Sequence, residues 1–166
     1  MSLLNLFTWL EATTVGVWVR ESLYGFPILV AIHILGLTMS VGIVVWFDLR
    51  LLGISMRSVA VSTVYRRLMP WAFAGFTSMF VSGGLLLSGF AVSAYGNSYF
   101  RTKMAALLLA GVNALVYHTV TERRIAEWDS AVRPPSPARL AGLLSIALWI
   151  VVIMAGRMVA YTLYSH

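Results

Sequence analysis

Long apolar segments of this sequence contain a few side chains that could do chemistry. They are two histidines, an asparagine and an arginine: His33, Asn113, His118 and Arg157. An ionisable side chain in hydrocarbon costs roughly 2.5–3.5 kcal/mol on insertion scales, so each should face other protein and have a partner. A buried imidazole can ligate haem iron, bind another metal or carry a proton. It can also simply bond a neighbouring helix.

The segments that hold these residues are each long enough to cross a bilayer, which takes about 20 apolar residues in a helix. We place the spans at about 26–52, 70–90, 100–121 and 140–164. With 60% hydrophobic and 11% charged residues, the surface suits lipid rather than water. The sequence therefore predicts a single all-α domain over residues 1–166, an integral membrane antiparallel four-helix transmembrane bundle.

The basic residues are unevenly distributed between the connections. Eight of the 12 lie in the first and third connections or at their edges: Arg50, Arg57, Arg66, Arg67, Arg123, Arg124, Arg133 and Arg139. Cytoplasmic loops are enriched in Lys and Arg, so both connections should face the cytoplasm, with both termini and the 91–99 connection outside. The net charge of +6 is thus explained by topology, and no nucleic-acid partner is expected.

The chain before the first span, residues 1–21, has its own pattern. Four apolar residues share one helical face: Leu3, Leu4, Phe7 and Leu10. This predicts a short helix lying in the membrane interface, and Glu11 argues against a fifth span. The chain has no cysteine, which excludes disulfides, thiolate metal sites and covalently attached haem.

The two histidines lie on helix faces with small residues. His33 shares a stripe with Gly36, Ser40, Phe47 and Asp48 that should face inward. His118 lies above Gly111 and Ala114, which would let a flat macrocycle or another helix approach. Residue counting puts the two imidazoles at depths about 10–17 Å apart, which does not favour one haem shared by both.

A second polar group is expected in the outer half of the bundle. Arg157 counts to the depth of His33, Lys103 enters on the same side, and Tyr161 is near. Such a cluster could meet a haem propionate or a quinone headgroup, and we prefer it to the inner group of His118 and Asp48 as the site. The alternative is a structural ion pair, with Glu21 as counter-ion of Arg157 or Lys103.

Other polar, small and sulfur-containing residues can be explained by structure alone. Asp48 and Arg50 are expected to be interfacial charges. Small residues recur along the second span and predict a close helix seam: Ala74, Ser78, Ser82, Gly84 and Ser88. Four methionines lie in the outer half of the spans: Met39, Met104, Met154 and Met158. Their thioethers could bind Cu(I), but methionine is also a common residue of apolar cores.

Several runs carry a family resemblance. They are Glu21-Ser22, Phe26-Pro27, His33, 48–53, Pro70-Trp71, Gly75-Phe76, Asn97, Phe100, Lys103, 111–113, His118, Gly156-Arg157 and Ala160-Tyr161. With them the chain resembles a group of small bacterial four-span membrane proteins known only as a domain of unknown function. That resemblance implies a multi-pass protein of the bacterial inner membrane and no activity. A weaker likeness is to four-helix membrane cytochromes b, which usually place histidine pairs at matching depth, unlike this chain.

These observations lead to one expected function and two alternatives. The first is a small electron-transfer or quinone-interacting subunit, with haem b or quinone near His33 and Arg157. Lys103 would balance acidic groups, and His118 would be a second ligand or proton relay. The alternatives are a non-catalytic membrane anchor or assembly subunit and, less favoured, a transporter of a metal or small solute. Expected partners are the lipid bilayer, other membrane or periplasmic subunits, or a second copy of the chain.

Overall fold

The computed structural model describes residues 3–163, and no described residue belongs to a β-strand. The elements, in chain order, are α1 (Leu3–Glu11), α2 (Thr14–Glu21), α3 (Gly25–Leu51), α4 (Val61–Gly89), α5 (Ala91–Gly96), α6 (Ser98–Val116), the π-helical turn η1 (Tyr117–Thr121), the 3-10 turn η2 (Glu122–Arg124), α7 (Ile125–Trp128) and α8 (Ser136–Leu163). Four helical segments are long and apolar enough to cross a membrane, which confirms the predicted fold class. Residues 1–2 and Tyr164, at the ends of predicted segments, lie outside the described residues.

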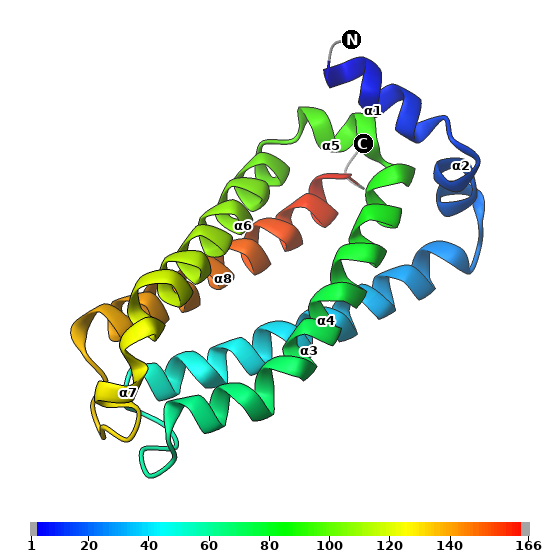
Figure 1. Ribbon diagram of the computed structural model, residues 1–166. Helices are drawn as coiled ribbons and strands as arrows, with labels where there is room; N and C mark the ends of the chain where they lie inside the picture. The colour runs from blue at the N-terminus through cyan, green and yellow to red at the C-terminus, as the bar shows by residue number, and fades with distance from the viewer. Residues whose placement is uncertain (1–2, 164–166) are drawn as a thin grey trace.

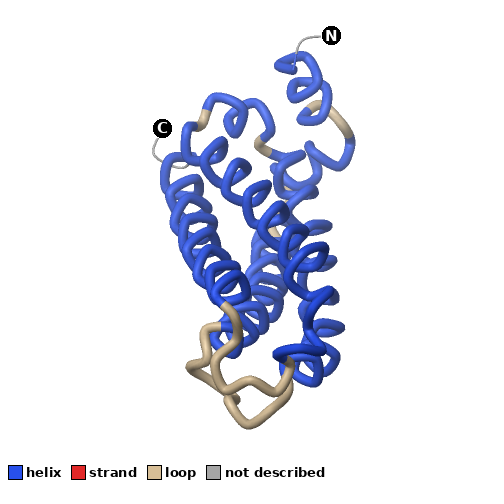
Figure 2. The backbone as a smooth tube through the Cα atoms, turned by 60° about the vertical axis from the view of Figure 1, so that its left-hand side comes forward, coloured by secondary structure: helices blue, strands red, loops and turns tan. Residues whose placement is uncertain are grey.

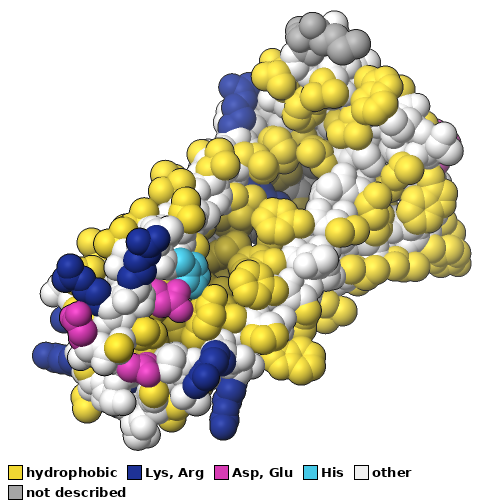
Figure 3. All heavy atoms as spheres, in the orientation of Figure 1, with side chains coloured by type: hydrophobic (Ala, Val, Ile, Leu, Met, Phe, Trp, Pro, Cys, Tyr) yellow, Lys and Arg dark blue, Asp and Glu magenta, His cyan; other side chains and the backbone are white. Residues whose placement is uncertain are grey.

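The four long segments form two antiparallel pairs. Helix α3 packs along α4, α6 packs along α8, and the pairs meet mainly through α3 and α8, whereas α4 and α6 hardly touch. Both termini lie at one end of the bundle, which we call the terminal end, and α3 and α4 separate toward it, α4 leading to α5 and α3 toward α2 (Figure 1). The connections 52–60 and 122–135, the second of which contains η2 and α7, close the opposite end (Figure 2). We call it the basic end, because arginine side chains gather there (Figure 3).

The α3–α4 pair is held by direct backbone contact at two glycines. A Cβ added to Gly36 would lie 2.9 Å from the carbonyl oxygen of Gly75, and one added to Gly75 would lie 2.7 Å from the amide nitrogen of Ser40. Small residues permit such an approach when lipid provides no hydrophobic drive for association. The predicted seam on α4 is thus shifted, since Gly75 makes the contact whereas Ala74 and Gly84 are exposed.

The inward stripe predicted on α3 is confirmed. Gly36, Ser40, Phe47 and Asp48 are buried, and His33 is half-buried. At mid-bundle, residues from all four long helices close into a core, which we call the mid-bundle core: Val41, Met79, Ala106, Trp149 and Val152. This core divides the space between the pairs into a basic-end half and a terminal-end half.

Helix α4 begins at Val61, well before Pro70, where the sequence predicted its start. The amides of its first turn donate hydrogen bonds to Asp129, which lies 67 or more residues further along the chain. The Val61 amide donates to the Asp129 carbonyl at 3.0 Å, and the Ser62 amide donates to Asp129 Oδ1 at 2.7 Å. A long-range cap of this kind leaves no signal in the local sequence.

Arg50 joins the two loops of the basic end. Its side chain is fully buried; Nε donates to the Val59 carbonyl at 2.8 Å, and Nη2 donates to the Ala131 carbonyl at 3.1 Å. The residue predicted to be an interfacial charge is therefore a buried link between the loops.

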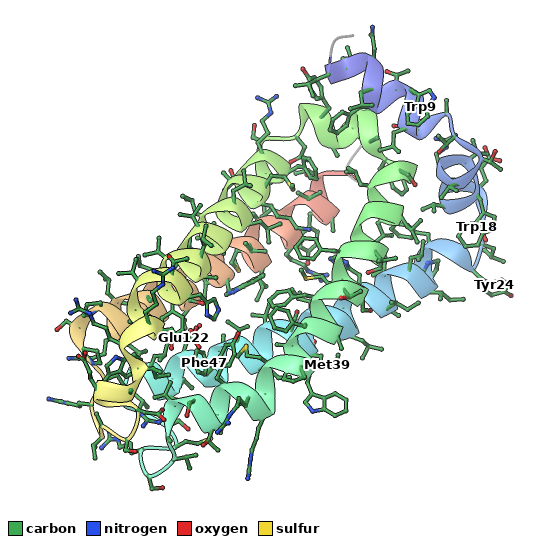
Figure 4. The ribbon with its side chains drawn as sticks, in the orientation of Figure 1. Trp9, Trp18, Tyr24, Met39, Phe47 and Glu122 are labelled. Carbon is green, nitrogen blue, oxygen red and sulfur yellow. The ribbon has the colours of Figure 1, made fainter. Side chains whose placement is uncertain are left out.

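The predicted N-terminal interfacial helix is two helices. Thr13 separates them, and its Oγ1 accepts from the Gly16 amide at 3.2 Å as an N-cap. Val19 of α2 is fully buried against Gly89 of α4, so the segment packs on the bundle. Trp9, Trp18 and Tyr24 remain exposed along this edge (Figure 4).

Candidate functional site

A cavity of about 360 Å³ lies between the two pairs, in the basic-end half. All four long helices and η1 line it: Val44, Phe47, Asp48, Leu51, Tyr65, Met69, Phe73, Phe76, Phe80, Leu107, Ala110, Gly111, Asn113, Ala114, Tyr117, His118, Ala141, Ser145 and Trp149. Because α4 and α6 hardly touch, the space between the pairs opens sideways, and Figure 3 shows the molecule hollowed there. The lining is mostly apolar and aromatic, as in sites for small organic molecules.

Two polar atoms in the wall of this cavity have no hydrogen-bond partner among the described residues. They are Oδ2 of Asp48 and the hydroxyl of Tyr117, on residues that are only 4% and 5% exposed. Asp48 uses its carboxylate in one side-chain hydrogen bond, with Ser145 of α8. Leaving a buried donor or acceptor unpaired costs about 1–3 kcal/mol, so such atoms mark a place where a ligand could complete the bonding.

Asn113 adds an amide to the same wall. Its Nδ2 donates to the Ala141 carbonyl at 2.9 Å and so ties α6 to α8 beside the cavity. Asn113 and His118 were both candidate site residues of the third span. The structure brings both into the lining of one cavity, together with Asp48.

The end of the cavity is formed by the π-helical turn η1. His118 Nδ1 bonds the carboxylate of Glu122, and its ring packs against Tyr65 at 5.4 Å and Tyr117 at 5.3 Å between centroids. Phe47 of α3 and Glu122 both lie toward this end (Figure 4). A π-turn inserts an extra residue into the helical register, and such turns often occur at functional sites. Here the turn gives a buried Tyr117 next to a half-buried His118.

His33 lies on the other side of the mid-bundle core. Its Nδ1 donates to the Met79 carbonyl at 2.9 Å and lies 3.2 Å from Ser82 Oγ, while Gly83 leaves room for the ring. Met79 is 14 residues along α4 from Tyr65, the residue beside His118, so the imidazoles are roughly 20 Å apart along the bundle. The two histidines cannot share one iron at that separation.

The expected outer cluster is only partly assembled. Arg157 is exposed on α8, with Nη2 3.3 Å from the Tyr161 hydroxyl and the guanidinium 4.9 Å from that ring. Lys103 instead lies half-buried over Gly156, and Glu21 pairs with Arg20 at 3.8 Å rather than with either of them.

No candidate metal site emerges from the described part of the chain. The methionines proposed as an alternative do not converge on His33, since Met39, Met104 and Met154 are exposed. Among the described residues there is no group of three or more histidine and acidic side chains placed to hold a metal ion.

Sequence reasoning missed several residues of the cavity. Tyr65, Tyr117 and Ser145 contribute polar atoms, and three phenylalanines of α4 make an aromatic wall. The four-residue spacing of Phe76 and Phe80, and the position of Tyr117 beside His118, were available signals. Nothing local indicated the π-turn that combines these residues.

A family model matches residues 6–162, which is nearly the whole chain. The protein belongs to DUF6644, a family of unknown function. Neither a curated protein nor a solved structure matches the chain. The family membership agrees with the resemblance found in the sequence and assigns no chemistry to the cavity, so its function must be argued from its residues.

Proposed function

We propose that this protein is a membrane electron-transfer subunit that binds a quinone in the basic-end cavity. The observation that carries the proposal is the pairing of an apolar, aromatic cavity with the unpartnered Asp48 Oδ2 and Tyr117 hydroxyl in its wall. A quinone has the same division, with a flat apolar ring and polar oxygens at its edge. The proposal moves the site from the outer cluster favoured by the sequence to the inner one.

The polar groups suit both redox forms of such a ligand. The Tyr117 hydroxyl could donate to a quinone carbonyl, and the Asp48 carboxylate could accept from a hydroquinone hydroxyl. The ring would stack among Phe76, Phe80 and Trp149. The sideways opening between α4 and α6 offers an isoprenoid tail a route into the surrounding lipid.

His118 and Glu122 would connect this site with the basic end. Reduction of a quinone takes up two protons, and this hydrogen-bonded pair is part-exposed, with side-chain exposures of 38% and 28%. An imidazole is suited to relay protons. We assign the basic end to the cytoplasm of a bacterial inner membrane on the charge asymmetry alone, with electrons supplied by a partner subunit.

Haem b is the less supported ligand of the two first expected. The separation of His33 and His118 means that one iron could have only one of them as a ligand, through Nε2, because each ring bonds the protein through Nδ1. A haem would therefore need a single protein ligand. The visible spectrum tests this directly, because a Soret band lost in His118→Ala or His33→Ala would replace quinone by haem in the proposal.

A photoreactive short-chain quinone, added to the protein in lipid nanodiscs, tests the main proposal. We expect cross-links to fall within residues 107–118 and 141–149 and to be competed by unlabelled quinone. Gly111→Leu should abolish them, because a side chain at Gly111 enters the open space of the cavity. Gly42→Leu is the matched control, since Gly42 is an exposed mid-helix glycine with open space around it and does not line the cavity. Equal labelling of both variants would contradict the proposal.

A further inference from the structure

A second polar site lies between the helix pairs, on the terminal-end side of the mid-bundle core. Its central residue is Lys103, the only lysine of the chain, on the second turn of α6. The side chain lies half-buried across α8 at Gly156, where an added Cβ would come 3.7 Å from Cδ and 3.8 Å from Nζ. The absence of a side chain at Gly156 makes room for the lysine stem.

His33 lies on the same side of the mid-bundle core, on the other helix pair. One turn beyond Lys103, Ala106 packs in the mid-bundle core with Met79, whose carbonyl holds the His33 imidazole. Lys103 and His33 therefore both lie on the terminal-end side of that core, one on each helix pair. Figure 3 shows the space between the pairs as a hollow, with basic side-chain atoms deep inside it.

No carboxylate of the described residues is available to Lys103. The six acidic residues of the chain are all placed elsewhere. Glu11 and Glu21 pair with Arg20 at 3.4 and 3.8 Å. The other four lie on the basic-end side of the mid-bundle core: Asp48, Glu122, Glu127 and Asp129. A cation at this depth without an anion is costly, so the position favours a bound anion.

We propose that Lys103, with His33 opposite, binds the anionic headgroup of a membrane lipid, through its phosphate or carboxylate. An ammonium offers three donors to such oxygens. The lipid is favoured over a soluble anion because the site lies inside a membrane-spanning helix and the gap between α4 and α6 opens sideways. The acyl chains would leave through that gap. The site is separate from the quinone cavity, which lies beyond the mid-bundle core.

Native mass spectrometry of the purified protein tests this site. Equal amounts of phosphatidylglycerol and phosphatidylethanolamine are added, and the lipids retained at rising collision energy are counted. We expect wild type to retain one phosphatidylglycerol with at least tenfold preference, and Lys103→Met to lose that preference. Arg101→Met is the matched control and should keep it, because Arg101 is an exposed cation two residues away on the same helix.

Further variants separate this site from a folding defect and from the cavity. Lys103→Arg should keep the preference by retaining the charge, and Gly111→Leu should keep it because the cavity lies on the other side of the core. Loss of the preference in Gly111→Leu, or equal loss in Arg101→Met and Lys103→Met, would overturn the proposal. Displacement of the lipid by inorganic phosphate at equimolar concentration would overturn the assignment to a lipid.

Discussion

The two helix pairs of this protein are built in different ways. The α3–α4 pair crosses at Gly36 and Gly75, where backbone meets backbone with no space for a single methyl group. The α6–α8 pair is joined by a side-chain hydrogen bond from Asn113 and by the Lys103 stem over Gly156, at ordinary van der Waals distances. The tight pair thus provides a fixed wall, and the looser pair carries most of the polar groups.

The pairs are also joined unequally at the two ends. At the basic end, Arg50 and Asp129 reach between loops and helices that belong to different pairs. At the terminal end α3 and α4 separate, and the short helix α5 leads from α4 to α6 (Figure 1), with His33 on one pair and Lys103 on the other. The stronger joining at the basic end does not satisfy every buried polar group there, since Asp48 Oδ2, Arg50 Nη1 and the Tyr117 hydroxyl have no hydrogen-bond partner among the described residues. At the terminal end the open group is instead the ammonium of Lys103.

The largest loss of stability should come from adding one methyl group at the close contact between α3 and α4. In Gly36→Ala the new Cβ would lie 2.9 Å from backbone atoms of α4, so the helices must move apart. Overpacking of this kind costs about 3 kcal/mol at the upper end of its usual range. Unfolding by sodium dodecyl sulfate, followed by circular dichroism, measures the loss of free energy.

The same substitution in the looser pair provides the control. Gly156→Ala would place its Cβ 3.7 Å from the Lys103 side chain, an ordinary contact, and should change the free energy of unfolding by less than about 0.5 kcal/mol. If the two alanine variants were equally destabilised, the contrast between the pairs would be wrong.

The next effect should come from the link at the basic end. Arg50→Met removes the hydrogen bonds to the Val59 and Ala131 carbonyls, which should cost about 2 kcal/mol because the donor is charged. Hydrogen–deuterium exchange should rise in residues 52–60 and 129–135 together. Arg57→Met, which removes an exposed arginine of the same loop, should leave exchange unchanged. Faster exchange in only one loop would show that Arg50 does not join them.

Asp129 should make a smaller, pH-dependent contribution. Burial alone would raise the pKa of Asp129, but the hydrogen bonds from Ser62 and the charges of Arg50 and Arg66 outweigh it and lower the pKa. A carboxyl whose pKa is lowered in the folded state stabilises the fold at pH values above its pKa in the unfolded chain, about 3.9. This stabilisation is lost as the pH falls through the pKa of the folded state. Asp129→Asn should therefore cost about 1 kcal/mol at neutral pH, as loss of a helix cap does.

Unfolding curves from pH 7 down to pH 2 measure this dependence. Wild type and Asp129→Asn should converge at the acidic end, where the carboxyl of wild type is protonated. A difference that stays constant across the whole range would mean that the charge of Asp129 does not stabilise the cap of α4.

The smallest effect should be at the hydrogen bond inside the looser pair. Asn113→Ala removes the bond to the Ala141 carbonyl. Bonds between membrane helices average about 0.6 kcal/mol in double-mutant cycles, and we expect a loss of that size. Thermal unfolding in detergent, compared with Thr102→Ala, whose hydroxyl bonds only its own helix, measures the difference. A loss as large as that of Gly36→Ala would contradict a loosely joined pair.

The residues that could be placed from sequence were those with a repeating pattern. The stripe of Gly36, Ser40 and Asp48 on the first span was predicted correctly, because a helix of known period has one smaller and more polar face. Pattern failed at Pro70, where a cap from Asp129 extends the helix backwards, and at Arg157, where the side chain bonds Tyr161 on its own exposed face. The depth of a residue along a span could be counted from the sequence. The direction of its side chain depended on which helices pack beside it.

The sequence by itself determined four apolar helices, their order and the depths of their polar residues, because hydrophobicity and helical rise are local properties. Only the tertiary structure decided which polar residues meet. The cavity is lined by Asp48 of α3, Asn113 of α6 and Tyr117 of η1. These residues share it only because α3 packs on α8 while α4 and α6 stay apart. Such pairing is set by close contacts between distant segments, which no local pattern encodes.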